Sequence, residues 1–136
     1  MSIGIEYEKA AFDVLPEGLG IADETGAVVL LNTAGARLLR LIGDDALGRD
    51  YREILPSIDS VGRDWWACTR PYDGLAIRTG QPERRLTLPD ERELYVTASY
   101  VRERRCGPLQ RLVVSFRGAA ERERAERDRA DLVSTV

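Results

Sequence analysis

The sequence predicts an α+β domain in which a five-stranded antiparallel sheet carries short helices on one face. Three observations support this fold class. Strand-like segments occur as a group of two and a group of three, with short helical segments between the groups. The last two strands alternate apolar with polar residues, as a sheet with one buried face requires. Glycine, proline and aspartate separate the segments at positions typical of turns.

The chain begins with an expected amphipathic helix. Apolar residues recur at helical spacing through Glu6–Val14, with Tyr7 and Val14 on the apolar face, and Pro16 follows the segment. Proline lacks the backbone N–H that a helix interior needs, so the helix should end before it. We therefore assign residues 1–15 to an N-terminal helix that precedes the main domain.

A strand pair and a longer helix come next. Leu19–Ala22 and Ala27–Leu31 predict two strands joined by an Asp-Glu-Thr-Gly turn. Asn32 is a good N-cap for a helix at Thr33–Ile42. Gly43 is the expected left-handed residue that ends this helix.

The middle of the chain is predicted as short helices and loops. Asp44–Pro56 indicates two short helical turns separated by a glycine, and Ser57–Gly62 indicates a loop. Tyr72–Arg78 predicts another short helix. Trp65–Cys68 is apolar but has no periodicity that assigns it to a helix or a strand.

Three strands are predicted in the second half, at Arg84–Leu88, Glu93–Val101 and Arg111–Arg117. In the last two strands the inward-facing set is wholly apolar, namely Leu94, Val96, Ala98, Leu112, Val114 and Phe116. This surface would line a pocket for an apolar ligand or form packed core. We favour packed core, because small-molecule sites usually contain several convergent polar groups.

The adjacent Trp65 and Trp66 allow two interpretations. Their large aromatic surfaces would suit the wall or lid of an apolar ligand pocket. The favoured alternative places one tryptophan in the core and the other over the surface. Both tryptophans are therefore candidates for a ligand pocket or for the core.

The arginines of the second half also allow two interpretations. Arg70, Arg78, Arg84 and Arg85 would form an anion-binding cluster if their side chains converged. A solvated, ion-paired face is the favoured alternative.

Candidate interface residues lie on the opposite face of the last two strands. Tyr95, Thr97 and Val113 alternate with the apolar set and should therefore face outward. We expect this mixed surface to pack on the Tyr7–Val14 helix or on a partner.

The final segment, residues 119–136, predicts a charged helix that leaves the domain. Its i,i+4 ion pairs contribute only about 0.2–0.5 kcal/mol each, too little to offset helix nucleation. The helix therefore needs a partner, such as a second copy of itself. A weak coiled-coil seam follows 4-3-4 spacing at Ala125, Arg129, Leu132 and Val136. A frayed, solvated helix is the alternative.

Composition excludes several classes of function. The 136 residues include no histidine, which removes Ser-His-Asp and Cys-His catalysis and the commonest haem ligand. We therefore expect neither a catalytic site nor a metal site. A net charge of −3 argues against nucleic-acid binding, and no apolar run is long enough to span a membrane. Cys68 and Cys106 have no metal-ligand spacing and indicate a reducing compartment, so we expect a cytoplasmic protein.

The order of these segments resembles that of a PAS domain. The stretch GLGIADETGAVVLLNTAGARLLRLIGDDALGRDYREILP is similar to the first half of that fold, and AIRTGQPERRLTLPDERELYVTASYVRE to the second. The resemblance covers Ala11–Arg117, and we place the sensor domain at residues 16–118. PAS domains commonly end in an Asp-Ile-Thr-type signature, whose place is taken here by Gly118, Ala119 and Ala120. This departure predicts a looser joint to the final helix.

The resemblance implies a sensory or regulatory domain rather than an enzyme. The ending Arg129–Val136 resembles the start of the dimerisation helix of sensor histidine kinases, ahead of their phosphoacceptor histidine. We therefore expect a homodimeric sensor of a two-component kinase whose kinase domains lie in a longer protein. The alternative is a ligand-free dimerisation or interaction module.

The resemblance also bears on cofactors. Light-sensing LOV domains use a cysteine in an Asn-Cys-Arg-Phe-like helix, which the surroundings of Cys68 do not match. Flavin and haem are therefore disfavoured. A small apolar ligand remains the expected type of ligand, if one binds.

Overall fold

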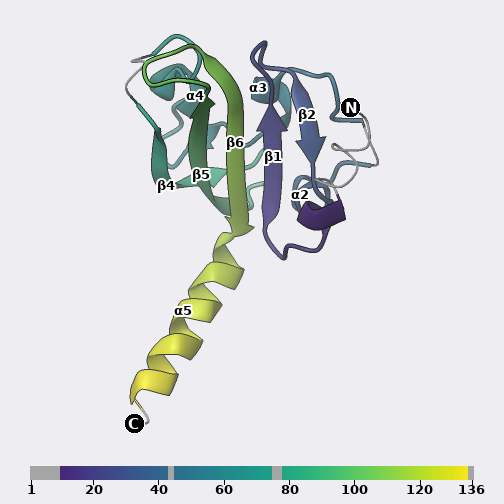
Figure 1. Ribbon diagram of the computed structural model, residues 1–136. Coiled ribbons are helices and arrows are strands. Elements are labelled where there is room, and N and C mark those ends of the chain that lie inside the picture. The colour runs from purple at the N-terminus through teal and green to yellow at the C-terminus, as the bar shows by residue number, and fades with distance from the viewer. Residues whose placement is uncertain (1–9, 43–44, 75–77, 135–136) are drawn as a thin grey trace.

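The computed structural model describes residues 10–42, 45–74 and 78–134. Its centre is one antiparallel sheet with the strand order β2-β1-β6-β5-β4-β3. The short helices lie on one face of this sheet, and α5 projects away from it (Figure 1). The strands are β1 (Gly18–Ala22), β2 (Val28–Leu31), β3 (Ile58–Asp59), β4 (Gly80–Thr87), β5 (Glu93–Arg102) and β6 (Leu109–Gly118). The helices are α2 (Thr33–Leu39), α3 (Tyr51–Ile54), α4 (Trp65–Thr69) and α5 (Ala119–Ser134).

The predicted α+β class is confirmed, but the sheet has six strands rather than five. The additional strand, β3, has two residues and pairs with the end of β4. It lies in the segment predicted as a loop, since two residues are too few to show alternation. Strand β4 is also longer than predicted and begins at Gly80. A Cβ at that position would collide with the Ala98 carbonyl of β5, so glycine permits the close pairing.

Helix α2 begins as predicted but ends early. The Asn32 side chain caps it by accepting from the Gly35 N–H. The helix ends at Leu39, because Arg40 adopts a left-handed conformation with φ of 56°. The helix therefore ends before the predicted Ile42, which is 82% exposed, and Gly43 lies outside the described residues.

The N-terminal helix is described only from Ala10, where residues 10–13 are helical. Phe12 packs on Leu19, Ile21 and Leu30 at the outer face of the sheet. Val14 is 81% exposed, so its predicted place on the apolar face is wrong. The helix has already ended in a turn there, and Tyr7 lies outside the described residues.

Helix α4 gives the unassigned tryptophan segment its structure. Asp64 caps it by accepting from the N–H groups of Trp66 and Ala67. Residues 71–74 form turns, so the described part of the helix predicted at Tyr72–Arg78 is not helical. Residues 75–77 of that prediction lie outside the described residues.

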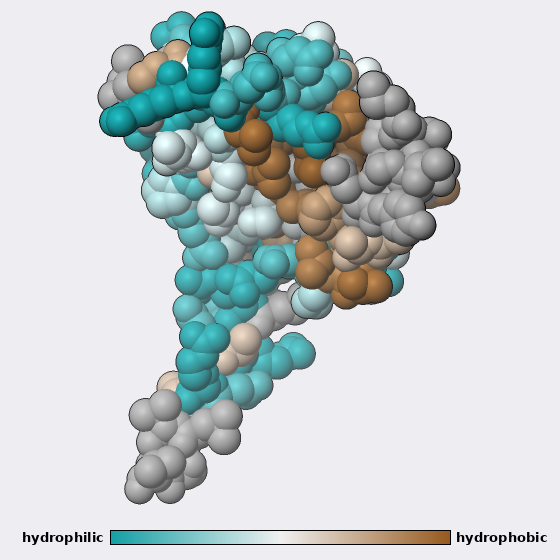
Figure 2. All heavy atoms as spheres, viewed as in Figure 1, coloured by the Kyte–Doolittle hydropathy of each residue, from teal (hydrophilic) through white to brown (hydrophobic). Residues whose placement is uncertain are grey.

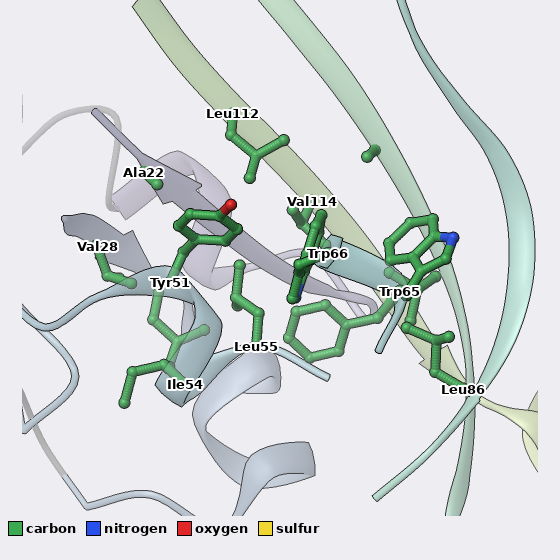
Figure 3. Packing of buried hydrophobic residues seen from close by; sticks show 14 of the residues in the cluster. Ala22, Val28, Tyr51, Ile54, Leu55, Trp65, Trp66, Leu86, Leu112 and Val114 are labelled. Carbon is green, nitrogen blue, oxygen red and sulfur yellow. The ribbon is translucent and has the colours of Figure 1, made fainter. Parts of the chain in front are cut away.

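The core lies between the sheet and the short helices. The six residues predicted to face inward on β5 and β6 are each 0–3% exposed, as predicted. Trp65 and Trp66 are 4% and 2% exposed, so the expectation that one of them covers the surface is wrong. Figure 3 shows both rings pointing into the cluster that packs against Leu86 and Val114. The two α4 tryptophans thus supply much of the core's aromatic surface.

Candidate functional site: the aromatic core and the joint to the exit helix

Four aromatic side chains form a connected cluster beneath the sheet. The Tyr51 ring meets Trp66 edge-on at 5.1 Å between centroids, and Tyr72 at 5.4 Å. Trp65 and Trp66 lie 4.7 Å apart. Edge-on and tilted pairs of this kind add stabilisation to that of area burial. The cluster therefore has a defined geometry, in which Tyr51 of α3 packs against Trp66 of α4 (Figure 3).

Burial sets the ionisation of the two tyrosines in this cluster. It raises the pKa of Tyr51 to about 12. Burial also raises the pKa of Tyr72, whose hydroxyl donates to the Asp23 carbonyl at 2.6 Å. Both side chains are therefore neutral donors and acceptors at physiological pH.

The same region contains buried polar atoms without hydrogen-bond partners. Among the described residues these include Trp66 Nε1 and Thr69 Oγ1 on α4, and the Tyr100 hydroxyl on β5. A buried polar atom left unpaired costs free energy, so such atoms usually pair with another protein group or with ordered water. Trp66 belongs to the core cluster and Tyr100 packs against it, whereas Thr69 is half-buried on α4.

The joint between the sheet and α5 is the second part of the site. Helix α5 follows β6 directly, and Ala119 at its start is only 6% exposed. Arg122 pairs with Glu83 of β4 at 2.6 Å, and its guanidinium lies 4.3 Å from the centre of the Tyr95 ring. A cation over an aromatic face is attracted to the ring's quadrupole. Arg122 thus ties the first turn of α5 to two strands.

Further ion pairs surround this contact. Arg85 pairs with Glu93 of β5 and with Glu123 of α5, the latter at 3.5 Å. Arg117 adds a longer contact to Glu83 at 3.5 Å. The predicted loose joint is therefore not found: side chains beyond the Gly-Ala-Ala positions hold the helix to the sheet. The sequence offered no signal for this, because the partners are distant along the chain.

The other predicted interface residues are divided between two regions. Tyr95 belongs to the joint, whereas Val113 packs with the apolar group on the outer face of β1 and β2. Thr97 is half-buried between them on β5. Figure 2 shows a hydrophobic band over β1 and β6, next to a hydrophilic α5.

On α5, Ala125 and Arg129 are exposed, and the side chains of Leu132 and Val136 lie outside those described.

The arginines predicted as a cluster do not converge as one group. Arg70 pairs with Asp73, Arg84 with Asp59 and Arg85 with Glu93, which supports the ion-paired alternative for these three. Arg78 has no carboxylate partner among the described residues. It lies instead beside the loop that joins β5 to β6.

The described residues contain no group of Cys, Asp or Glu side chains arranged to hold a metal ion. Cys68 and Cys106 are both exposed. None of the described helices is long and apolar enough to cross a membrane.

Comparison with known proteins agrees with this architecture. A family model described as "PAS fold" matches residues 12–124. No curated protein is significantly similar to this chain in sequence. Among solved structures, the PAS domain of Bordetella pertussis BvgS is 18% identical, with a TM-score of 0.57 over 96% of this chain and 98% of that chain.

Two further structures have the same fold. A Rhodobacter sphaeroides LOV protein is 18% identical, with a TM-score of 0.61 over 88% of this chain and 68% of that one. A PAS domain from a two-component sensor histidine kinase is 9% identical, with a TM-score of 0.56 over 86% of this chain and 97% of that one. Identities this low indicate shared fold alone. With the family model matching most of its length, the chain belongs to the PAS fold family.

Proposed function

We propose that this PAS domain is the cytoplasmic sensory module of a two-component sensor histidine kinase, and that it passes its signal through α5. Domains of this family are generally non-catalytic sensory modules. One structural relative is the PAS domain of such a kinase. The output element of the proposal is α5, since it is the one described helix that leaves the sheet (Figure 1).

The contact of Arg122 with Tyr95 and Glu83 is the observation that carries this proposal. Tyr95 lies on the outer face of β5, and its neighbours Leu94 and Val96 lie on the inner face and belong to the core. A change in core packing that shifts β5 would therefore move the ring against which Arg122 rests. A stimulus acts through such a link only if it binds the two arrangements with different affinity.

The ligand we propose is a small aromatic molecule with one or two polar atoms. Its rings would replace or extend the contacts of Tyr51 and Trp66, and its polar atoms would pair with groups such as Trp66 Nε1. Neither haem nor flavin is part of the proposal. The chain has no histidine, and Cys68 is exposed rather than in the core.

p-Cresol and toluene are matched probes for this proposal, because they differ by one hydroxyl. We expect p-cresol to raise the melting temperature more than toluene and to change amide exchange at residues 119–126. Trp66→Phe removes one unpaired donor and should reduce the difference in melting temperature between the chain with p-cresol and the chain with toluene. If neither probe changes the melting temperature or the amide exchange, the result would contradict ligand sensing.

A ligand-free dimerisation module is the second candidate function. The packing of the inner face favours it, because the six inward residues of β5 and β6 are each at most 3% exposed. Under this alternative α5 would still pair with a second copy, but no probe would bind the core. Dimerisation together with silence of both probes would support it over sensing.

A further inference from the structure

We propose that the end of the sheet remote from α5 binds a phosphate-bearing small molecule in a hollow lined by arginines. The hollow has a volume of about 460 Å³ and lies between the β5–β6 loop and the residues before β4. Its lining residues are Arg78, Thr79, Tyr100, Arg102, Arg104, Arg105 and Cys106. Figure 1 shows this loop at the top of the domain, opposite the exit helix.

Charge is the first argument for this site. Among the described residues, four guanidinium groups line the hollow and no carboxylate does. None of these four arginines has a carboxylate partner among the described residues, whereas ion pairs are usual elsewhere, as for Arg49 with Glu53. The nearby Glu103 carboxylate instead accepts from Gln110. Like charges held together repel one another, and an anion between them would relieve that repulsion.

The position of Arg102 is the second argument, because hydrogen bonds fix it without neutralising it. Its Nε donates to the Gly107 carbonyl at 2.9 Å, and another nitrogen donates to the Arg78 carbonyl at 2.6 Å. Its guanidinium lies 5.6 Å from the centre of the Tyr100 ring. Arg102 therefore joins the two walls of the hollow and retains its full charge.

The chemistry of the side chains identifies the class of ligand. Guanidinium presents several donors in a plane, which suits the paired oxygens of phosphate and favours bidentate contacts. Arg78, Arg104 and Arg105 are exposed, so their side chains are free to adjust to such a group. A volume of this size falls within the range of about 300–1,000 Å³ typical of small-molecule sites. A molecule with more than one phosphate group fits both the charge and the space.

Calorimetric titration with sodium pyrophosphate in 150 mM NaCl tests this proposal. This ionic strength limits attraction between distant exposed charges, since the screening length is about 8 Å. We expect the double variant Arg104→Gln/Arg105→Gln to bind pyrophosphate at least tenfold more weakly than the unmodified chain. The matched control is Arg37→Gln/Arg49→Gln, which removes the same charge from distant exposed positions and should stay within twofold.

Backbone amide NMR shifts locate the binding in the same samples. Shifts confined to residues 102–107 and 78–80 would support the hollow as the site. No binding at 5 mM pyrophosphate, or equal weakening in the two double variants, would overturn the proposal. These readouts do not involve the aromatic core, so the failure of one proposal leaves the other standing.

A second arm distinguishes free phosphates from lipid headgroups. Vesicles of phosphatidylcholine and phosphatidylglycerol at 3:1 are sedimented with the chain, with and without pyrophosphate. If the vesicles bind the chain and pyrophosphate reverses this binding, the result supports the hollow as the binding site, with a lipid headgroup as a source of the phosphate. The proposal would be contradicted if the vesicles bound the chain in the presence of pyrophosphate as well as in its absence, and the chain did not bind pyrophosphate itself.

Discussion

Asn32 joins three segments of the domain through one side chain. It is fully buried, and its Oδ1 accepts from the N–H groups of Leu19 and Gly35, both at 2.8 Å. Its Nδ2 donates to the carbonyls of Phe12 and Glu17. The residue therefore connects the N-terminal helix, the start of β1 and the start of α2.

We expect Asn32→Ala to lower the free energy of unfolding by about 3 kcal/mol, because it leaves buried groups of the backbone unpaired. Urea denaturation measures this change. Thr33→Ala, at the exposed neighbour, is the control and should change stability by no more than about 0.5 kcal/mol. A loss below 1 kcal/mol for Asn32→Ala would show that water replaces the side chain.

Asp59 gives the domain a pH dependence in acid. The pKa of this carboxyl is lowered, first of all because it accepts a hydrogen bond from the backbone N–H of Arg63. Burial alone would raise the pKa. Further hydrogen bonds from the Val61 N–H and the Arg63 guanidinium outweigh that effect. A carboxyl with a lower pKa in the folded state contributes stability above its unfolded value of about 3.9. That contribution is lost as pH falls through the folded value.

Melting temperatures between pH 7 and pH 2.5 check this assignment. We expect the unmodified chain to lose stability below pH 4 more steeply than Asp59→Asn, which has no charge to lose. The two curves should therefore converge in acid. Parallel curves would mean that other carboxyls account for the acid sensitivity.

At the scale of elements, the joint of α5 depends on contacts with other strands. Arg122 pairs within α5 with Glu126 at 2.7 Å and outside it with Glu83, so one guanidinium serves both the helix and the sheet. From Arg124 to Ala130 the side chains of α5 are exposed. Loss of Arg122 should therefore release the start of the helix without unfolding the domain.

We expect Arg122→Gln to increase amide exchange at residues 119–126 several-fold while the melting temperature of the domain changes little. Arg124→Gln is the matched control, because Arg124 is exposed on the same helix. Equal effects of the two substitutions would indicate a general loss of helix propensity and would remove the specific role of Arg122.

Some elements could be predicted from the sequence and others could not. Alternation predicted β5 and β6 because each has ten residues with one buried face. The end of α2 could not be predicted, because Arg92 of the β4–β5 turn donates to the Leu38 carbonyl at 2.6 Å. Arg40, two residues after Leu38, pairs with Asp90 of the same turn. These contacts span about 50 residues, so no local pattern records them.

Parts of the candidate site could likewise be predicted from the sequence, and other parts could not. The inner face of the sheet follows from period-two alternation, and its residues were predicted correctly. The burial of both tryptophans was not predicted, because α4 has five residues and begins at an aspartate cap rather than through an amphipathic pattern. The contact of Arg122 with Tyr95 was also missed, since it joins residues 27 positions apart.

At the scale of the whole molecule, α5 is the expected dimer element. Its seam residues Ala125 and Arg129 are exposed, as a surface awaiting a partner would be. A charged residue at a core position of a coiled coil reduces stability. We therefore expect Arg129→Leu to lower the dimer dissociation constant more than tenfold in sedimentation equilibrium.

The control for this prediction is Arg124→Leu, which adds the same side chain away from the seam. It should leave the dissociation constant within about twofold. Equal tightening by both substitutions would indicate non-specific apolar association rather than a defined helix pair.

In the proposed function, the packing of the core sets the state of α5 through Tyr95 and Arg122. Amide exchange at residues 119–126 in Trp66→Phe tests it most directly, because this substitution changes the core and touches neither the joint nor the helix. We expect exchange there to change several-fold relative to the unmodified chain, and the change to disappear when Arg122→Gln is also present. Unchanged exchange along α5 in Trp66→Phe, with the domain still folded, would show that the core and the helix are not coupled.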